Sequence, residues 1–366
     1  MRTAGVAERR AAGIVIRSLL RAALGLAGAC TGCAIGAADL AANGAAVADD
    51  TAAGRATGAA ALAANGAAVA GDTALFAYDA AAPLDVEIGR RSRNRGFTLV
   101  QLDYASPDGG RVPALLYEPA LVSASPAPAV LLMHGLPGSR GSLSSLAAAY
   151  ARAGVYVLAI SAPWARRPAY RPFSLLPTPL FDDHDRAELV QLIRDLRRAV
   201  DYLESDPRIA ADRIAFVGHS AGGMAGALLA GVEQRVAAWV LMAATPGWIS
   251  TIRHYEATRP DEFWLEPLDA LTAEQRAAWT RGLEPLEATH WIGNARAPML
   301  LQAGTLDRSV PAADVQRLFD AASEPKSIEW YALPHALGPT AFADQARFLA
   351  RHLGFPADRF VAPDRM

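Results

Sequence analysis

The chain has 366 residues, enough for one large α/β domain with appendages. Its 35 basic and 37 acidic side chains give a formal net charge of −2, which argues against a nucleic-acid-binding class that relies on a basic surface. The only cysteines are Cys30 and Cys33, so the chain beyond them contains neither a disulfide nor a thiol nucleophile.

The first 38 residues have the layout of an export signal. Five arginines within the first 21 residues precede an uncharged run of small and apolar residues over 22–38. Within that run, Cys30 ends a stretch that resembles a bacterial lipobox, with Ala27 where leucine is more usual. We therefore expect an exported protein that is periplasmic, extracellular or lipid-anchored, with Cys30 as the one candidate site of lipid attachment. The alternative is a cytoplasmic protein in which this segment is not a signal.

A short duplication follows the leader. The segment Leu40–Ala52 recurs as Leu62–Ala74 with one change, Gly71 in place of Asp49. Two copies are too few to form a solenoid, and a segment rich in Ala and Gly without aromatic residues cannot offset its ordering entropy. We expect residues 39–82 to be a linker and residues 83–366 to form the folded domain.

The remaining chain alternates between strand-like and helix-like segments, which favours a mostly parallel sheet with helices on both faces. A long segment, residues 246–294, interrupts this rhythm and is expected to be a mostly helical insertion rich in aromatic residues. The predicted strands are 97–104, 111–117, 127–133, 155–160, 214–217, 236–243, 298–302 and 327–332. The predicted helices are 142–153, 187–204, 224–230, 312–322 and 341–353.

One glycine-flanked serine lies between a predicted strand and a predicted helix. Gly218-His219-Ser220-Ala221-Gly222 fits the Gly-x-Ser-x-Gly pattern in the strand–turn–helix context of a nucleophile elbow. Glycines at the flanking positions let the strand and helix backbones approach closely. The following helix directs its N-terminus, and the amide of Ala221, toward an oxyanion formed at this serine.

A serine nucleophile requires a base and an acid that orients the base. Asp307 follows the predicted strand 298–302, and His335 follows the strand 327–332. A second oxyanion donor is expected from the loop after the strand 127–133, and the amide of Leu136 lies there. Asp307 could instead cap the helix that follows Pro311, but no acidic residue after the strand 236–243 competes for the catalytic role.

The order Ser220, Asp307, His335, together with His134-Gly135-Leu136-Pro137-Gly138, resembles the α/β-hydrolase superfamily. The resemblance spans residues 95–355 and is greatest to the dienelactone hydrolase and acyl-thioesterase-like esterase branch. It implies an α/β-hydrolase fold and cleavage of a small-molecule carboxylic ester through an acyl-serine, without metal or cofactor. Dienelactone hydrolases use a cysteine nucleophile, so the serine here favours a plain serine esterase.

Three alternatives remain open at this stage: a prolyl-oligopeptidase-like peptidase, an acyl thioesterase, and a non-catalytic binding module with the same fold. Trp164 and Trp248 follow predicted strands and are candidate substrate contacts. His219 is interpreted as a packing residue and His134 as a side chain that braces its loop.

Overall fold

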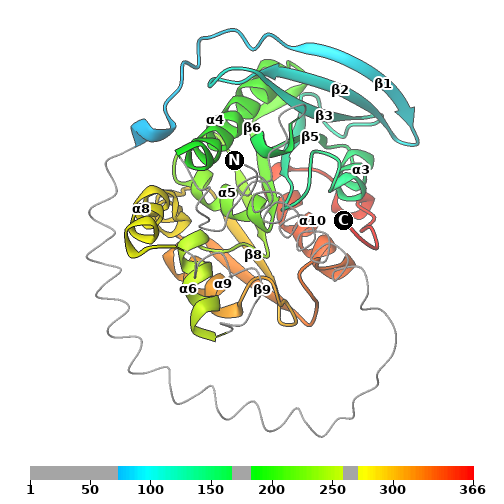
Figure 1. The fold of residues 1–366 in the computed structure, drawn as a ribbon. Coiled ribbons are helices and arrows are strands. Elements are labelled where there is room, and N and C mark those ends of the chain that lie inside the picture. Colours follow the sequence, from blue (N-terminus) through cyan, green and yellow to red (C-terminus); the bar gives the residue numbers. More distant parts are fainter. Residues whose placement is uncertain (1–72, 167–182, 259–270) are drawn as a thin grey trace, which may run out of the picture. The chain divides into compact units, whose positions relative to one another are not determined.

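The computed structural model describes residues 73–166, 183–258 and 271–366, with the side chains of 183–185 left aside. The predicted leader, with Cys30, and all but the last ten residues of the predicted linker lie outside these ranges. The described strands form one nine-stranded sheet. Figure 1 shows helices on both sides of this sheet. The strands are β1 (Glu87–Asn94), β2 (Phe97–Ala105), β3 (Arg111–Pro119), β4 (Ala127–Met133), β5 (Tyr156–Ile160), β6 (Ile209–His219), β7 (Ala238–Met242), β8 (Met299–Gly304) and β9 (Lys326–Tyr331).

The strand order is β1-β2-β3-β5-β4-β6-β7-β8-β9. The strands β1, β2 and β3 pair antiparallel, and β3 is also antiparallel to β5. The six strands β4 to β9 run parallel to one another. The mostly parallel sheet predicted from the sequence is confirmed. Because β5 and β6 flank β4 on opposite sides, the chain changes direction across the sheet at β4. In open α/β sheets, ligands bind outside the carboxyl ends of strands at such a point.

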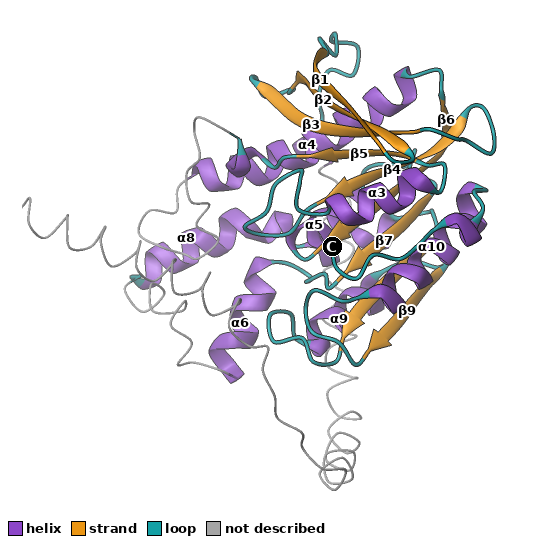
Figure 2. Ribbon diagram, turned by 90° about the vertical axis from the view of Figure 1, so that its right-hand side faces the viewer, coloured by secondary structure: helices purple, strands orange, loops and turns teal. Residues whose placement is uncertain are grey.

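Helices lie on both faces of the sheet (Figure 2). Two hydrophobic layers lie between the helices and the sheet, one on each face. Alternate residues of each central strand enter different layers: Phe216 of β6 joins the layer beneath α4 and α5, and Val217 joins the layer beneath α3 and α10. This alternation is the two-residue period of a strand that is buried on both faces.

The described helices are α3 (Ser144–Arg152), α4 (Asp183–Ser205), α5 (Ala221–Ala230), α6 (Trp248–Thr258), α8 (Ala273–Leu283), α9 (Ala312–Ala321) and α10 (Pro339–Leu353). Short 3-10 helices are η1 (Thr73–Phe76), η2 (Pro163–Ala165), η4 (Glu284–Leu286), η5 (Ala288–His290), η6 (Ile292–Asn294) and η7 (Ala357–Arg359).

The folded unit extends upstream of residue 83, where the sequence analysis placed its start. Phe76 is fully buried and its ring packs edge-on against Trp291 at 5.1 Å. The hydroxyl of Tyr78 donates to Asp201 on α4. These two aromatic residues follow the repeat directly, and they provide the apolar surface that the repeat lacks.

The insertion over 246–294 is helical where the structure describes it, comprising α6, α8 and the short helices η4 to η6. Tyr255, Trp279 and Trp291 are each 5% exposed or less, so these aromatic side chains belong to the core. Phe263 and Trp264 lie outside the described residues. Within the described ranges, no helix is long and apolar enough to span a membrane.

Candidate active site

Ser220 lies at the sharp turn between β6 and α5. Its backbone has φ 56° and ψ −120°, a conformation that is strained for a residue with a side chain. The Ser220 amide donates to the carbonyl of Met242 at the end of β7, at 2.8 Å, and its carbonyl accepts from the Met224 amide within α5. These bonds hold the turn at the carboxyl edge of the sheet, with Ser220 partly exposed.

Glycines make the close approach at this turn possible. A Cβ atom at Gly218 would overlap the carbonyl oxygen of Gly222, and one at Gly222 would overlap the carbonyl oxygen of Met133 at the end of β4. Both obstacles are backbone atoms, so neighbouring side chains cannot relieve the overlap by changing rotamer. The sequence-based reason for glycine on both sides of Ser220 is therefore supported by the packing.

The loop after β4 lies against the same turn. A Cβ atom at Gly135 would approach the Ser220 Cβ to 2.9 Å, so the two backbones are in contact. The next residue is Leu136, whose amide donates to no other backbone carbonyl in the described ranges. Ala221 is the first residue of α5, where amides have no partner within the helix. Both predicted oxyanion donors thus flank Ser220 on the chain segments that meet there.

Asp307 and His335 form a hydrogen-bonded pair after β8 and β9. His335 Nδ1 lies 2.7 Å from Asp307 Oδ2, and the side chains are 26% and 3% exposed. The other oxygen of Asp307 accepts from the amides of Ser309 and Val310 at 2.7 and 3.0 Å. A carboxylate can only accept, so Nδ1 of His335 carries the proton in this pair, and in the neutral form of the ring Nε2 keeps its lone pair.

Backbone contacts bring His335 to the nucleophile turn. The imidazole of His219, the residue before Ser220, lies with Nε2 3.0 Å from the carbonyl oxygen of His335. The two imidazole rings have centroids 4.8 Å apart. The Ser220 hydroxyl itself forms no hydrogen bond with His335 or another described residue. In enzymes without bound substrate, such catalytic hydrogen bonds are often long and shorten in the substrate complex.

His134 braces the loop after β4, as the sequence analysis expects. Its Nδ1 donates to the Gly135 carbonyl at 2.8 Å, and its Nε2 accepts from the Ala162 amide at 3.1 Å. Burial lowers the pKa of this imidazole below its usual value, which favours the neutral form that this bonding pattern requires.

The two predicted substrate contacts differ in accessibility. Trp164, in η2, is 4% exposed and packs in the core, so little of its surface is available to a substrate. Trp248, at the start of α6, is partly exposed, and its indole Nε1 has no hydrogen-bond partner in the described part of the chain. Trp248 is therefore the better placed of the two. The described residues contain no cluster of His, Cys, Asp and Glu suited to a metal ion.

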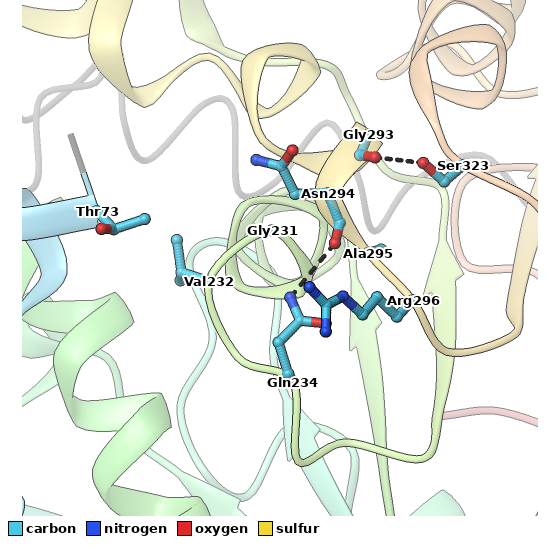
Figure 3. Close-up of a pocket in the computed structure, with 9 residues that line it drawn as sticks. All are labelled: Thr73, Gly231, Val232, Gln234, Gly293, Asn294, Ala295, Arg296 and Ser323. Carbon is cyan, nitrogen blue, oxygen red and sulfur yellow. Dashed lines mark hydrogen bonds between the residues drawn. The ribbon is translucent and has the colours of Figure 1, made fainter. Parts of the chain in front are cut away.

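One surface pocket in the described part of the chain lies away from the residues of the candidate active site (Figure 3). It is at the C-terminal end of α5, about 15 Å along the helix from Ser220 by the rise per residue. It contains none of the residues predicted for catalysis. Its lining residues are Thr73, Gly231, Val232, Gln234, Gly293, Asn294, Ala295, Arg296 and Ser323.

Comparison with known proteins gives one partial family match. The sequence profile of the prolyl oligopeptidase family matches residues 185–334, which is less than half of the chain but includes the predicted serine and aspartate. No curated protein matches the chain.

Solved structures show a similar arrangement of helices and strands. An acetyl xylan esterase from Paenibacillus sp. R4 is 19% identical with a TM-score of 0.63, covering 79% of this chain and 92% of that one. Acetyl xylan esterase 1 from Thermoanaerobacterium sp. JW/SL YS485 is 16% identical, also with a TM-score of 0.63, covering 79% and 93%. The α/β hydrolase GrgF from Penicillium sp. sh18 is 18% identical with a TM-score of 0.52, covering 73% and 100%. These similarities establish a shared fold.

Proposed function

We propose that this chain, which has the α/β-hydrolase fold, is a serine hydrolase that cleaves carboxylic esters through an acyl-serine intermediate. Ser220 is the nucleophile, His335 the general base and Asp307 the acid that orients it. The observation that carries this proposal is the Asp307–His335 pair at 2.7 Å, which occupies Nδ1 and keeps the other imidazole nitrogen available to act as the base. That this chain belongs to the dienelactone hydrolase and acyl-thioesterase-like esterase branch stays a prediction from the motifs.

The first half-reaction forms the acyl-enzyme. The Ser220 oxygen attacks the ester carbonyl while its proton moves to Nε2 of His335. The carboxylate of Asp307 stabilises the resulting imidazolium without taking its proton. The amides of Leu136 and Ala221 donate to the oxyanion of the tetrahedral intermediate, and losing one such donor typically costs a factor of about 10² to 10³ in rate. The intermediate collapses as His335 protonates the leaving alcohol.

The second half-reaction regenerates the serine. Water attacks the acyl-serine carbonyl and gives a proton to His335, and the same two amides hold the second oxyanion. The carboxylic acid product leaves when His335 returns the proton to Ser220. Every step uses side chains and amides of this chain, and each group keeps its position between the two halves.

Replacement of the nucleophile tests the proposal. Ser220→Ala should lower kcat for p-nitrophenyl acetate by a factor of roughly 10⁴ or more, because no other group replaces the attacking oxygen. A fluorophosphonate probe should label the wild-type protein at Ser220 and leave the variant unlabelled. Full esterase activity in Ser220→Ala, with the protein folded, would disprove the assignment. A wild-type protein that neither hydrolyses esters nor reacts with the probe would indicate the non-catalytic binding module instead.

The similar acetyl xylan esterases suggest a short acyl group as the substrate of this chain. A panel of p-nitrophenyl esters of increasing acyl length tests this point, with acetate expected to give the highest kcat/KM. A maximum at long acyl groups would instead indicate an apolar acyl pocket. An acyl thioesterase would prefer the matching thioesters over the oxygen esters.

The match to the prolyl oligopeptidase family makes a peptidase the second candidate. The same nucleophile, base and oxyanion donors can cleave an amide, so the geometry alone does not separate the two activities. Hydrolysis of proline-containing peptide nitroanilides distinguishes them: a kcat/KM for peptides above that for esters would favour the peptidase.

We also propose that the protein is exported, because a basic start and an uncharged small-residue run occupy its first 38 residues. N-terminal sequencing of the protein from a cell-envelope or secreted fraction should show a processed chain. If Cys30 is lipidated, Cys30→Ala should move the protein from the membrane to the soluble fraction. An unprocessed chain that remains in the cytoplasm would contradict export.

A further inference from the structure

The residue before the proposed nucleophile contacts two other parts of the candidate site. His219 is 8% exposed, and its Nε2 lies 3.0 Å from the carbonyl oxygen of His335. On its other side, a Cβ atom at Gly135 would lie 3.1 Å from Nδ1 of His219. A single imidazole thus lies between the loop that provides the base and the loop that provides an oxyanion donor.

The contact fixes the protonation of this ring. A carbonyl oxygen can only accept, so Nε2 of His219 must carry a proton and donate it. The ring is neutral near pH 7 because burial and the nearby imidazole of His335 lower its pKa to about 4, while the hydrogen bond to the His335 carbonyl and the carboxylate of Asp307 act in the opposite sense. His335 and Asp307 are the titratable groups identified as acting on His219 from the loops packed against it.

A neutral His219 suits the proposed chemistry. His335 becomes positively charged when it takes the serine proton, and its ring centroid is 4.8 Å from that of His219. A second positive charge at that distance would oppose formation of the imidazolium. A neutral donor holds the backbone of the base without this penalty.

We propose that His219 is a positioning residue, which holds the backbone of His335 in register with Ser220 through the Nε2–H···O=C hydrogen bond. The inference rests on the proposed function, since it assigns His219 a role in placing the proposed base. His219 itself does not contact the reacting atoms in this proposal. Its effect on catalysis passes through the position of His335 relative to Asp307 and Ser220.

Two substitutions separate this role from simple packing. His219→Phe keeps an aromatic ring but removes the donor, and His219→Gln keeps a donor without a titratable ring. We expect His219→Phe to lower kcat by about tenfold with little change in KM, equivalent to about 1.4 kcal/mol in the activation free energy. His219→Gln should recover most of that loss. Matched melting temperatures for the two variants show that folding is not the cause.

The pH profile provides a readout that packing alone does not move. In His219→Phe the His335 loop is free to shift away from Asp307, so the imidazolium that forms on His335 is less stabilised by the carboxylate. The acid limb of kcat/KM should therefore move to lower pH by about 0.5 to 1 unit in this variant and stay in place in His219→Gln.

Each outcome has a distinct meaning. Wild-type kcat and an unmoved acid limb in His219→Phe overturn the positioning role, provided Ser220→Ala is inactive. If Ser220→Ala retains activity, the proposed function fails instead. If His219→Phe does not fold, ring ¹⁵N NMR of the wild-type protein decides: a neutral Nε2–H tautomer of His219 supports the inference, and an Nδ1–H tautomer overturns it.

Discussion

Asp307→Asn tests the role of the proposed acid with the smallest change in shape. Oδ1 of Asp307 accepts from the Ser309 and Val310 amides, and Oδ2 accepts from Nδ1 of His335. The amide oxygen of asparagine can keep the two backbone bonds, which places its NH₂ group opposite His335. Two donors then face each other unless the imidazole moves its proton to Nε2.

That shift of the proton disables the base. With Nε2 protonated, His335 has no lone pair directed at the serine proton, so kcat should fall by a factor of about 10⁴, or about 5.4 kcal/mol in activation free energy. KM should change little, because Asp307 is 3% exposed and does not contact substrate in the proposed mechanism. The two retained backbone bonds should keep the loss of unfolding free energy below about 1 kcal/mol.

The assay is kcat and KM for p-nitrophenyl acetate, together with urea unfolding of the same preparations. Asp320→Asn is the matched control, because Asp320 is exposed and its carboxylate accepts from Gln316 on the same helix. Asp307→Ala separates the two roles: it should lose activity to the same extent, and stability as well, since it leaves both amides without an acceptor. An Asp307→Asn variant that is stable and retains more than a tenth of the wild-type kcat would refute the assignment.

Three further predictions concern the frame around the site. Gly222→Ala should be inactive or unfolded, because the new Cβ atom would overlap the carbonyl oxygen of Met133; activity near that of the wild type would contradict the model of a closely packed elbow. Glu287→Ala should reduce the unfolding free energy by about 1 to 3 kcal/mol, because the buried carboxylate accepts from the Ser250 amide and hydroxyl at the start of α6, whereas Glu287→Gln should retain most of the stability. Between pH 6.5 and about 4 the unfolded chain protonates His219 and the folded chain does not, so stability falls as pH decreases through this window. Across this window, the wild-type unfolding free energy should fall by on the order of 3 kcal/mol relative to that of His219→Gln, as measured by chemical unfolding at each pH. Parallel plots of unfolding free energy against pH for the two proteins would contradict the lowered pKa of His219.

The centre of the parallel sheet follows from the sequence because β4, β5 and β7 are continuous, fully buried apolar runs. The prediction of 127–133 matches β4 residue for residue, since alanines, valine, leucines and methionine there are buried on both faces. β1 was not predicted. Its sequence, Glu87–Asn94, contains three arginines and is exposed along almost its whole length, so it has neither an apolar run nor an alternating pattern. Only its pairing with β2 makes it a strand.

The site was predictable to the extent that chemistry fixes the residue type. A nucleophile elbow requires glycines, and the acid and base must follow strands that end at the same edge of the sheet, so motif order indicated Ser220, Asp307 and His335. The contact between His219 and the His335 carbonyl was not predictable, because it joins residues 116 apart in the chain through a backbone atom. The only sequence signal is the presence of a histidine, in place of an apolar residue, before the nucleophile.

The base loop is held from both sides by bonds that do not involve the nucleophile hydroxyl. The Leu306 amide, next to Asp307, donates to the Leu333 carbonyl at 3.1 Å, and His219 lies within hydrogen-bond distance of the carbonyl of His335. One bond ties the loop to the acid and the other to the nucleophile turn. The imidazole of His335 is therefore positioned before substrate arrives, and substrate binding does not have to supply free energy to order it. Since either bond can still restrain the loop when the other is lost, weakening both together should lower kcat by more than the product of the two separate losses.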